Sequence, residues 1–212
     1  MRTYRKLRRE RPEALSDSSA MLITVEGLDG AGKTTLIAGL ARELGATVLR
    51  EPGGVELSER IRGLVADHDV AIDPRAEALL FAAARAQLVA ERLRPLLESG
   101  ETVLLDRFVD SSLAYQGGGR ALGVEEVRAL NEFGTGGLRP DRTLLLRIAP
   151  ADGLARIAGR DADRLERAGG EFFERVAQTY DELAAAEPDR FVVLDATAPP
   201  DTVLAEALRA LT

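Results

Sequence analysis

A glycine-rich segment near the start of the chain carries the strongest chemical signal in the sequence. It matches the pattern G-x-x-x-x-G-K-[ST] at every fixed position, with the residues Gly27, Leu28, Asp29, Gly30, Ala31, Gly32, Lys33 and Thr34. Glycines allow the backbone to wrap around a polyphosphate with its N–H groups pointing inward. The lysine reaches the β- and γ-phosphates, and the threonine hydroxyl ligates Mg²⁺. We therefore predict binding of ATP or GTP by the segment Gly27–Thr35.

The surroundings of this segment are those that its mechanism requires. The apolar run Leu22–Val25 precedes it and predicts a strand, and Thr34–Leu44 predicts a helix. The N-terminus of that helix adds partial positive charge to the phosphate site. A chance glycine-rich turn would lack this strand–loop–helix context. The motif identifies a nucleotide triphosphate as ligand and leaves the type of reaction open.

An acidic and a basic residue follow a second apolar run. Asp106 and Arg107 come directly after Thr102–Leu105. An arginine at the carboxyl end of a strand points into the ligand crevice of an open α/β sheet, where its guanidinium group suits a second phosphate better than a catalytic water. A surface ion pair is the alternative interpretation. The base-binding Asn-Lys-x-Asp motif of GTPases is absent, because Asn131 is the only asparagine.

Composition excludes several other classes of function. The 212 residues include 28 Lys+Arg and 35 Asp+Glu, and the net charge of -7 argues against a broad nucleic-acid-binding face. The absence of cysteine excludes disulfides, thiolate metal sites and cysteine nucleophiles. A single histidine, His68, argues against a zinc site or a Ser-His-Asp triad. No apolar run approaches the roughly 18 residues of a membrane span. We expect a cytoplasmic protein without membrane or nucleic-acid partners.

Short apolar runs alternate with helical stretches from Met21 onward. The expected strands are Leu22–Val25, Thr47–Leu49, Thr102–Leu105, Thr143–Ile148 and Phe191–Leu194. The expected helices are Thr34–Leu44, Leu57–Val65, Arg75–Glu98, Val124–Glu132, Gly153–Arg160, Glu171–Ala186 and Asp201–Leu211. This alternation predicts a single α/β domain over residues 21–212, with a parallel sheet covered by helices on both faces. Residues 1–20 are basic and are predicted to form a disordered extension; a docking helix and a true start at Met21 are the alternatives.

The ordered set of motifs from Met21 to Leu211 resembles bacterial thymidylate kinase (dTMP kinase). The matching segments are Glu26–Thr35, Arg50–Gly54, Phe81–Val89, Asp106–Phe108, Ser111–Arg120 and Asp163–Glu166. The resemblance implies a P-loop NTPase fold of the nucleoside-monophosphate-kinase type, in three α/β/α layers with a five-stranded parallel sheet and a mobile lid. It also implies phosphorylation of dTMP to dTDP by ATP and Mg²⁺ in dTTP biosynthesis, and a homodimer. The long helix Arg75–Glu98 is a candidate for the dimer face.

The resemblance further implies a site for dTMP. Phe81 would stack on the thymine ring, and Arg85 would hydrogen-bond its O4; their i,i+4 spacing independently places both on one helix face. Tyr115 would press against C2′ and exclude a ribose hydroxyl by its bulk. The remaining implied contacts are made to the base by Ser112 and Gln116, to the nucleotide by Pro52, and to the acceptor phosphate by Arg50. The segment Gly117–Gly119 is either a flexible turn or a direct ligand contact.

The implied mechanism is mostly positioning and charge neutralisation. Arg107 would orient the acceptor, and Asp29 would position the acceptor or the metal shell. Thr34 and Asp106 would hold Mg²⁺. Because Ala31 stands where some thymidylate kinases carry an arginine, the chain resembles the type whose catalytic arginine comes from the lid, here residues 153–170. Arg160 and Arg164 are the candidates in that segment, and a solvated helix of mixed charge is the alternative.

Two rival functions remain open at this stage. The nearer one is another nucleoside or nucleoside-monophosphate kinase with the same fold. The second is a non-catalytic nucleotide-binding switch, which would bind ATP without acceptor-dependent turnover.

Overall fold

The computed structural model describes residues 20–159 and 164–211. The extension predicted for residues 1–20, apart from Ala20, and the candidate Arg160 lie outside these residues. Within the described part of the chain, no helix is long and apolar enough to cross a membrane.

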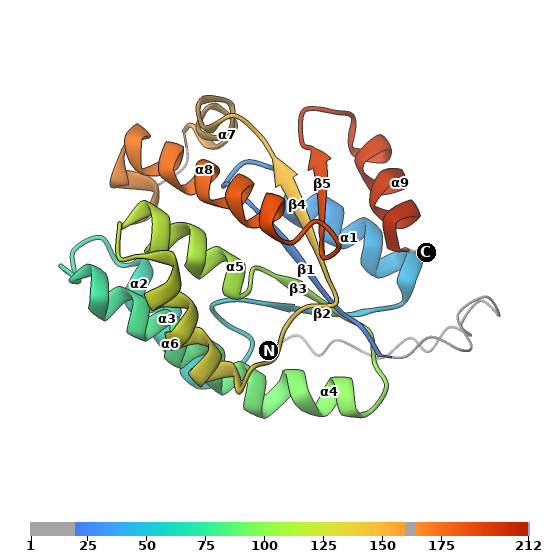
Figure 1. Cartoon of the computed structure of the whole chain (residues 1–212), viewed down its shortest axis with the longest axis horizontal. Helices are drawn as coiled ribbons and strands as arrows, with labels where there is room; N and C mark the ends of the chain where they lie inside the picture. The colour runs from blue at the N-terminus through green and yellow to red at the C-terminus, as the bar shows by residue number, and fades with distance from the viewer. Residues whose placement is uncertain (1–19, 160–163, 212) are drawn as a thin grey trace.

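A parallel sheet forms the centre of the domain (Figure 1). Its strands are β1 (Leu22–Gly27), β2 (Thr47–Arg50), β3 (Val103–Asp106), β4 (Arg142–Arg147) and β5 (Phe191–Asp195). They are arranged in the order β2-β3-β1-β4-β5, and every neighbouring pair is parallel. All five predicted strands are confirmed. The register pairs Val25 of β1 with Asp106 of β3, so the glycine-rich loop and Arg107 leave the sheet side by side at its carboxyl edge.

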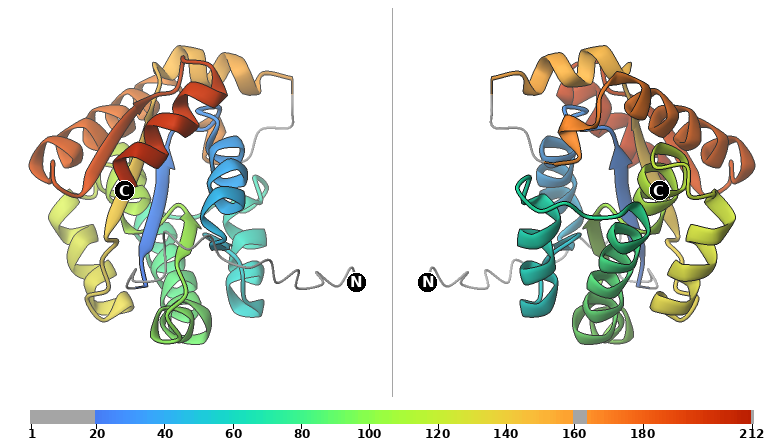
Figure 2. Two further views of the ribbon diagram at one scale, coloured as in Figure 1. Left: turned by 90° about the vertical axis from the view of Figure 1, so that its right-hand side faces the viewer. Right: turned by 90° about the vertical axis from the view of Figure 1, so that its left-hand side faces the viewer.

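Helices cover both faces of this sheet (Figure 2). The predicted helices are confirmed with small shifts at their ends, as α1 (Lys33–Leu44), α2 (Glu56–Ala66), α3 (Pro74–Leu88), α4 (Arg94–Glu98), α6 (Val124–Thr135), α7 (Pro150–Ile157), α8 (Gly170–Ala186) and α9 (Pro200–Leu211). Figure 2 shows α1 on one side of β1 and α8 on the other. Their buried side chains, among them Leu40 and Val176, join the strands in one hydrophobic core. The predicted three-layer α/β/α architecture is therefore confirmed.

The long helix predicted at Arg75–Glu98 is continuous but not uniform. A π-helical segment, η2 (Val89–Leu93), joins α3 to α4, and Pro95 lies in the first turn of α4. Asp73 caps α3 by accepting a hydrogen bond from the backbone N–H of Arg75 at 2.8 Å. This helix supplies Glu77, Phe81 and Arg85 from successive turns.

One part of the structure has no counterpart among the predicted helices. After β3 the chain forms a short helix, α5 (Val109–Ser112), followed by a π-helical segment, η3 (Leu113–Gly119). Gly118 and Gly119 pack directly against α8: a Cβ atom at Gly118 would lie 1.9 Å from Thr179 Oγ1, and one at Gly119 would lie 2.5 Å from the ring of Phe172. The glycines thus belong to a packed helical segment, which differs from the flexible turn considered from sequence. A short 3-10 helix, η4 (Glu166–Ala168), precedes α8.

Candidate active site

The glycine-rich loop between β1 and α1 is shaped for an anion. Gly30 and Gly32 have φ angles of 82° and 94°, in the left-handed region that favours glycine. A side chain at Gly30 would collide with the backbone, because its Cβ would lie 2.2 Å from the carbonyl oxygen of Gly153. No side chain caps the N-terminus of α1, which leaves its first N–H groups to a ligand. Thr34 and Thr35 are exposed in the first turn of that helix.

Lys33 lies inside the curve of this loop. Its Nζ donates hydrogen bonds to the carbonyl oxygens of Gly27 at 3.1 Å and Leu28 at 2.9 Å, and only 8% of the residue is exposed. Burial lowers the pKa of Lys33 to about 8; the charge of Arg107 adds to this effect and Asp29, at 3.7 Å, opposes it. Burial and Arg107 thus outweigh the carboxylates of Asp29, Asp106 and Glu26, and a bound phosphate would add further negative charge beside the ammonium group.

Arg107 reaches from β3 to the loop. Its Nη1 donates to the carbonyl oxygen of Gly27 at 3.1 Å, and its Nη2 donates to Asp29 Oδ1 at 2.7 Å. Its guanidinium carbon also lies 5.0 Å from the centre of the Tyr115 ring, whose hydroxyl contacts Asp29 at 3.3 Å. The backbone of Arg107 has a φ of 66°, which is uncommon for a residue with a side chain and typical of functional sites.

A buried carboxylate holds this strained turn. Glu26 is completely buried, and its Oε1 accepts the backbone N–H of Phe108 at 2.7 Å. Its Oε2 accepts hydrogen bonds from the hydroxyls of Ser111 and Tyr180 at 2.5 and 2.8 Å. Burial raises the pKa of Glu26, and the neighbouring Asp110 adds to that effect. Three donors, one from the turn itself and one each from α5 and α8, thus converge behind Arg107.

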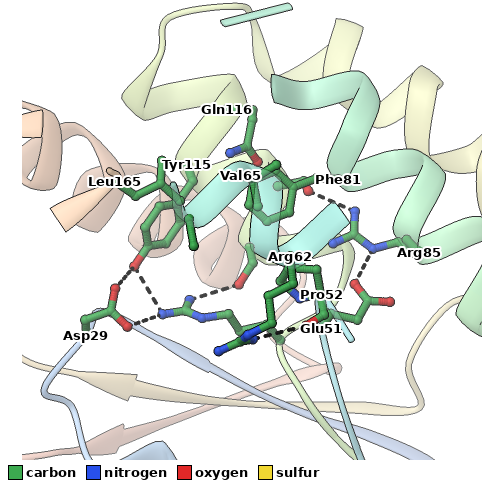
Figure 3. A pocket seen from close by; sticks show the side chains of 14 residues that line it. Asp29, Glu51, Pro52, Arg62, Val65, Phe81, Arg85, Tyr115, Gln116 and Leu165 are labelled. Carbon is green, nitrogen blue, oxygen red and sulfur yellow. Dashed lines mark hydrogen bonds and ion pairs between the residues drawn. The ribbon is translucent and has the colours of Figure 1, made fainter. Parts of the chain in front are cut away.

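A cavity opens beside Arg107, and Figure 3 shows the side chains around it. It is lined by eight residues singled out from the sequence: Asp29, Pro52, Phe81, Arg85, Arg107, Ser112, Tyr115 and Gln116. They come from the loop after β1, the segments that follow β2 and β3, and from α3, α5 and η3. The cavity brings together predicted site residues from distant parts of the chain, and it lies directly against the phosphate loop at Asp29.

Arg85 is held rigidly in the wall of this cavity. Its Nε donates to Glu51 Oε2 at 2.6 Å, its Nη1 donates to Ser112 Oγ at 2.8 Å and to Asn131 Oδ1, and its Nη2 donates to the carbonyl oxygen of Phe108 at 2.9 Å. A guanidinium group has five N–H donors. The described residues accept four of them, which leaves one N–H on Nη2 for a ligand.

Known proteins identify the family to which this site belongs. A family model described as thymidylate kinase matches residues 25–207. The chain is 53% identical to a thymidylate kinase of Deinococcus radiodurans over 195 residues, which cover 89% of this chain and 95% of that protein. It is 45% identical to a thymidylate kinase of Bacillus pumilus over 202 residues, or 91% and 95% of the two chains. The chain belongs to the thymidylate kinase family.

A solved structure agrees with this assignment. The crystal structure of thymidylate kinase from Ehrlichia chaffeensis superposes with a TM-score of 0.76 at 28% identity, over 92% of this chain and 99% of that one. The fold class predicted from sequence is confirmed, and so is the resemblance to bacterial thymidylate kinases. The chain is therefore an enzyme of this family, whose members transfer a phosphoryl group from ATP to dTMP.

Two arginines of this thymidylate kinase differ in their relation to the cavity. Arg50, predicted to contact the acceptor phosphate, donates through Nη2 to both carboxylate oxygens of Glu59, at 2.8 and 3.0 Å, and does not line the cavity. Arg62 of α2 does line it, and its Nη1 donates to the carbonyl oxygen of Pro52 at 3.1 Å. Arg62 was not predicted from the sequence, because a helix of mixed charge gives no signal for one particular arginine.

Three further residues of the site were given no role from the sequence. Glu51, Asn131 and Glu26 are all buried and act by holding an arginine or the turn beside it. Burial raises the pKa of Glu51 to about 7 against the opposing charge of Arg85. Glu51 belongs to the matching segment Arg50–Gly54 and follows directly after β2. A charged residue at the end of a strand and before Pro52 was the signal that could have indicated its role.

Two arginines of the lid, Arg156 and Arg164, are bonded to different parts of the structure. Arg156 donates through Nη1 to the carbonyl oxygens of Gly30 at 3.3 Å and Ala196 at 3.0 Å, beside a second cleft between the loop and the start of α9. Arg164, a predicted catalytic residue, donates to Glu77 Oε2 at 2.6 Å and to the carbonyl oxygen of Val65 at 3.1 Å. Its partners belong to α2 and α3, which contribute residues to the cavity, and not to the phosphate loop.

Proposed function

We propose that this thymidylate kinase transfers the γ-phosphoryl group of ATP to the phosphate of dTMP at the junction of the loop and the cavity. The observation that carries the proposal is the position of Arg107, which contacts both the loop at Gly27 and the cavity residue Asp29. A guanidinium group at this junction offsets the repulsion between two phosphate groups that must approach within bonding distance. A phosphate oxygen is already anionic near neutral pH, so the reaction needs no strong general base.

The phosphate donor is proposed to lie on the loop Gly27–Thr35. The uncapped N–H groups of α1 and the Lys33 ammonium group face this position. Donors fixed in advance stabilise the charge that develops on the transferred group without further reorganisation.

The cavity residues are proposed to bind dTMP as the family resemblance implies. Phe81 stacks on the thymine, and the remaining N–H of Arg85 donates to its O4. Tyr115 occupies the space of a ribose 2′-hydroxyl, while Pro52, Ser112 and Gln116 complete the walls. Arg62 and Arg107 are proposed to hold the acceptor phosphate, and a contribution from Arg50 requires that it leave Glu59.

The site also fits Mg²⁺. Asp106 Oδ1 is buried and has no hydrogen-bond partner among the described residues, and the Thr34 hydroxyl is exposed at the start of α1. Hard oxygen donors of this kind, few in number, are typical of Mg²⁺ sites that also use phosphate oxygens. Thr34 and Asp106 would hold the ion, which would neutralise phosphate charge.

The arginine finger and the assembly state belong to the same proposal. Arg160, outside the described residues, and Arg164 remain the proposed lid arginines.

A homodimer is supported by exposed apolar side chains on the neighbouring helices α2, α3 and α6: Leu57, Leu64, Leu79 and Phe133, of which Phe133 is 90% exposed. We place the enzyme in the cytoplasm.

A coupled assay of ADP release tests the proposed function. The enzyme is offered ATP with dTMP, dUMP, dCMP, dGMP or thymidine, and dTMP is expected to give the highest kcat/KM. Arg107→Met should lower kcat by two orders of magnitude or more while ATP still binds. ATP binding without acceptor-dependent ADP release would favour the nucleotide-binding switch instead.

A further inference from the structure

A buried carboxylate beside the acceptor cavity has no role in the reaction described so far. Glu77 lies in the first turn of α3 and is completely buried. Its Oε1 accepts a hydrogen bond from Gln116 Nε2 at 2.8 Å, and its Oε2 accepts from Arg120 Nη2 at 3.1 Å and Arg164 Nη2 at 2.6 Å. These partners are all donors, so both oxygens act as acceptors.

The carboxylate is held on two sides. Arg120 stacks over Phe172, with its guanidinium carbon 4.9 Å from the ring centre, and Arg164 is tied to the backbone of Val65. These two guanidinium groups fix the position of Glu77 and offset its charge. The carboxylate therefore presents a stationary acceptor to Gln116.

A stationary acceptor determines which way the Gln116 amide faces. A side-chain amide has a donor end and an acceptor end, and reversal would set its oxygen against an oxygen of Glu77. The donor end is on Glu77, so the acceptor end is left for the cavity, which Gln116 lines while only 1% exposed. In the described structure no residue donates to Gln116 Oε1. Figure 3 shows this side chain pointing toward Phe81.

We infer that Glu77 selects the nucleobase by holding Gln116 as a hydrogen-bond acceptor for the ring N3–H. The inference rests on the proposed binding of dTMP in this cavity. Thymine and uracil carry a donor at N3 and an oxygen acceptor at C4, whereas cytosine has a lone pair at N3 and an amino group at C4. An acceptor at Gln116 and a donor at Arg85 complement the first pattern and oppose the second at both positions. Glu77 is thus a specificity-determining residue that acts through Gln116.

The variant Glu77→Gln tests this inference. Its amide can donate as well as accept, so Gln116 becomes free to reverse. We expect kcat/KM for dTMP and dUMP to fall together by about tenfold and the dTMP:dCMP ratio of kcat/KM to fall by about tenfold. The dTMP:dUMP ratio and the KM for ATP should not change, because both bases carry N3–H. An equal loss for all three nucleotides would assign Glu77 a merely structural role and overturn the inference.

Two further variants complete the experiment. Glu56→Gln makes the same chemical change on the exposed surface of α2, where the partner is Arg60, and should alter no ratio. If Glu77→Gln does not fold, Gln116→Met decides, because Glu77 keeps both arginines in that variant. A tenfold lower dTMP:dCMP ratio supports the inference, and an unchanged ratio overturns it. Wild-type enzyme without dTMP-dependent ADP release would instead refute the proposed function.

Discussion

The positively charged side chains of this site are held in place by hydrogen bonds within the protein. Lys33 is hydrogen-bonded to two carbonyl oxygens, Arg107 to Asp29, and Arg85 to Glu51. Each is therefore oriented in advance, and little reorganisation is needed when phosphate or base arrives. The cost of this order appears in the lowered pKa of Lys33, because burial, with the charge of Arg107 added to it, disfavours the charged ammonium group.

The pH dependence of ATP binding should follow from Lys33. With a pKa of about 8 in the free enzyme, Lys33 is mostly neutral at pH 9, while bound phosphate favours its charged form. ATP binding above pH 8 must then take up a proton, and Kd should rise by up to about tenfold between pH 8 and 9. Calorimetry at pH 9 in two buffers of different ionisation enthalpy measures the uptake. A heat of binding that is the same in both buffers would contradict this assignment.

Arg62 and Arg50 provide a matched pair for the acceptor phosphate. Arg62 lines the cavity, whereas Arg50 is paired with Glu59 outside it. Arg62→Ala should raise the KM for dTMP by about tenfold or more, since charge-assisted hydrogen bonds contribute about 1.5–3 kcal/mol. Arg50→Ala should change it less than threefold, and neither should change the KM for ATP. If steady-state kinetics show a larger rise in the KM for dTMP in Arg50→Ala than in Arg62→Ala, Arg50 has the role predicted from sequence.

The residues that sequence reasoning found and missed differ in a physical way. Lys33, Arg107 and Arg85 stand in local motifs whose spacing carries their chemistry. The carboxylates that hold Arg85 and the turn after Arg107 lie far along the chain: Glu51 is 34 positions from Arg85, and Glu26 is 82 positions from Phe108. Both glutamates stand in motif segments, but the sequence does not show which donor each one holds, because only the fold brings the donor to it.

At the scale of elements, local periodicity predicted the long helices and failed for α5 and η3. The segment Val109–Gly119 ends in three glycines, which have a low intrinsic preference for helix. Tertiary packing overrides that preference, because α8 approaches η3 so closely that only glycine fits at Gly118. The π-helical geometry brings both Tyr115 and Gln116 to the cavity wall.

Gly118→Ala should therefore destabilise the fold and disturb the cavity. Its Cβ would lie 1.9 Å from Thr179 Oγ1 and 2.9 Å from Thr179 Cβ, so α8 or η3 must shift, at a cost of about 1–3 kcal/mol. Thermal or urea unfolding measures the loss, and the KM for dTMP should rise with it. Gly63→Ala in α2 is the control, since nothing lies within 4 Å of its Cβ and alanine favours helix by about 0.5–1 kcal/mol. Equal stability of the two variants would refute the packing argument.

At the scale of the whole molecule, strand order explains why distant motifs form one site. β1 lies between β3 and β4, so the carboxyl ends of β1 and β3 place the phosphate loop beside Arg107. The helical segments that connect the strands carry the residues of the cavity to the same edge. This arrangement was predictable as a fold class, because parallel strands alternating with helices allow few topologies. Periodicity did not predict which apolar side chains on the helices remain exposed to solvent.

The apolar face on α2, α3 and α6 is where we expect two copies of the chain to meet. Phe133 is its most exposed member at 90%, and a large aromatic side chain in water is costly unless a partner covers it. Phe133→Glu would place a charge in the contact and should weaken dimerisation at least tenfold, as measured by sedimentation velocity over a range of concentrations. Val193→Glu on β5, 41% exposed and outside this face, should leave association unchanged. Equal effects of the two variants would place the dimer contact elsewhere. A wild-type enzyme that is monomeric would rule out the dimer. A dimer through this face would also restrain α3, which carries Glu77, Phe81 and Arg85, so weaker association should raise the KM for dTMP more than that for ATP.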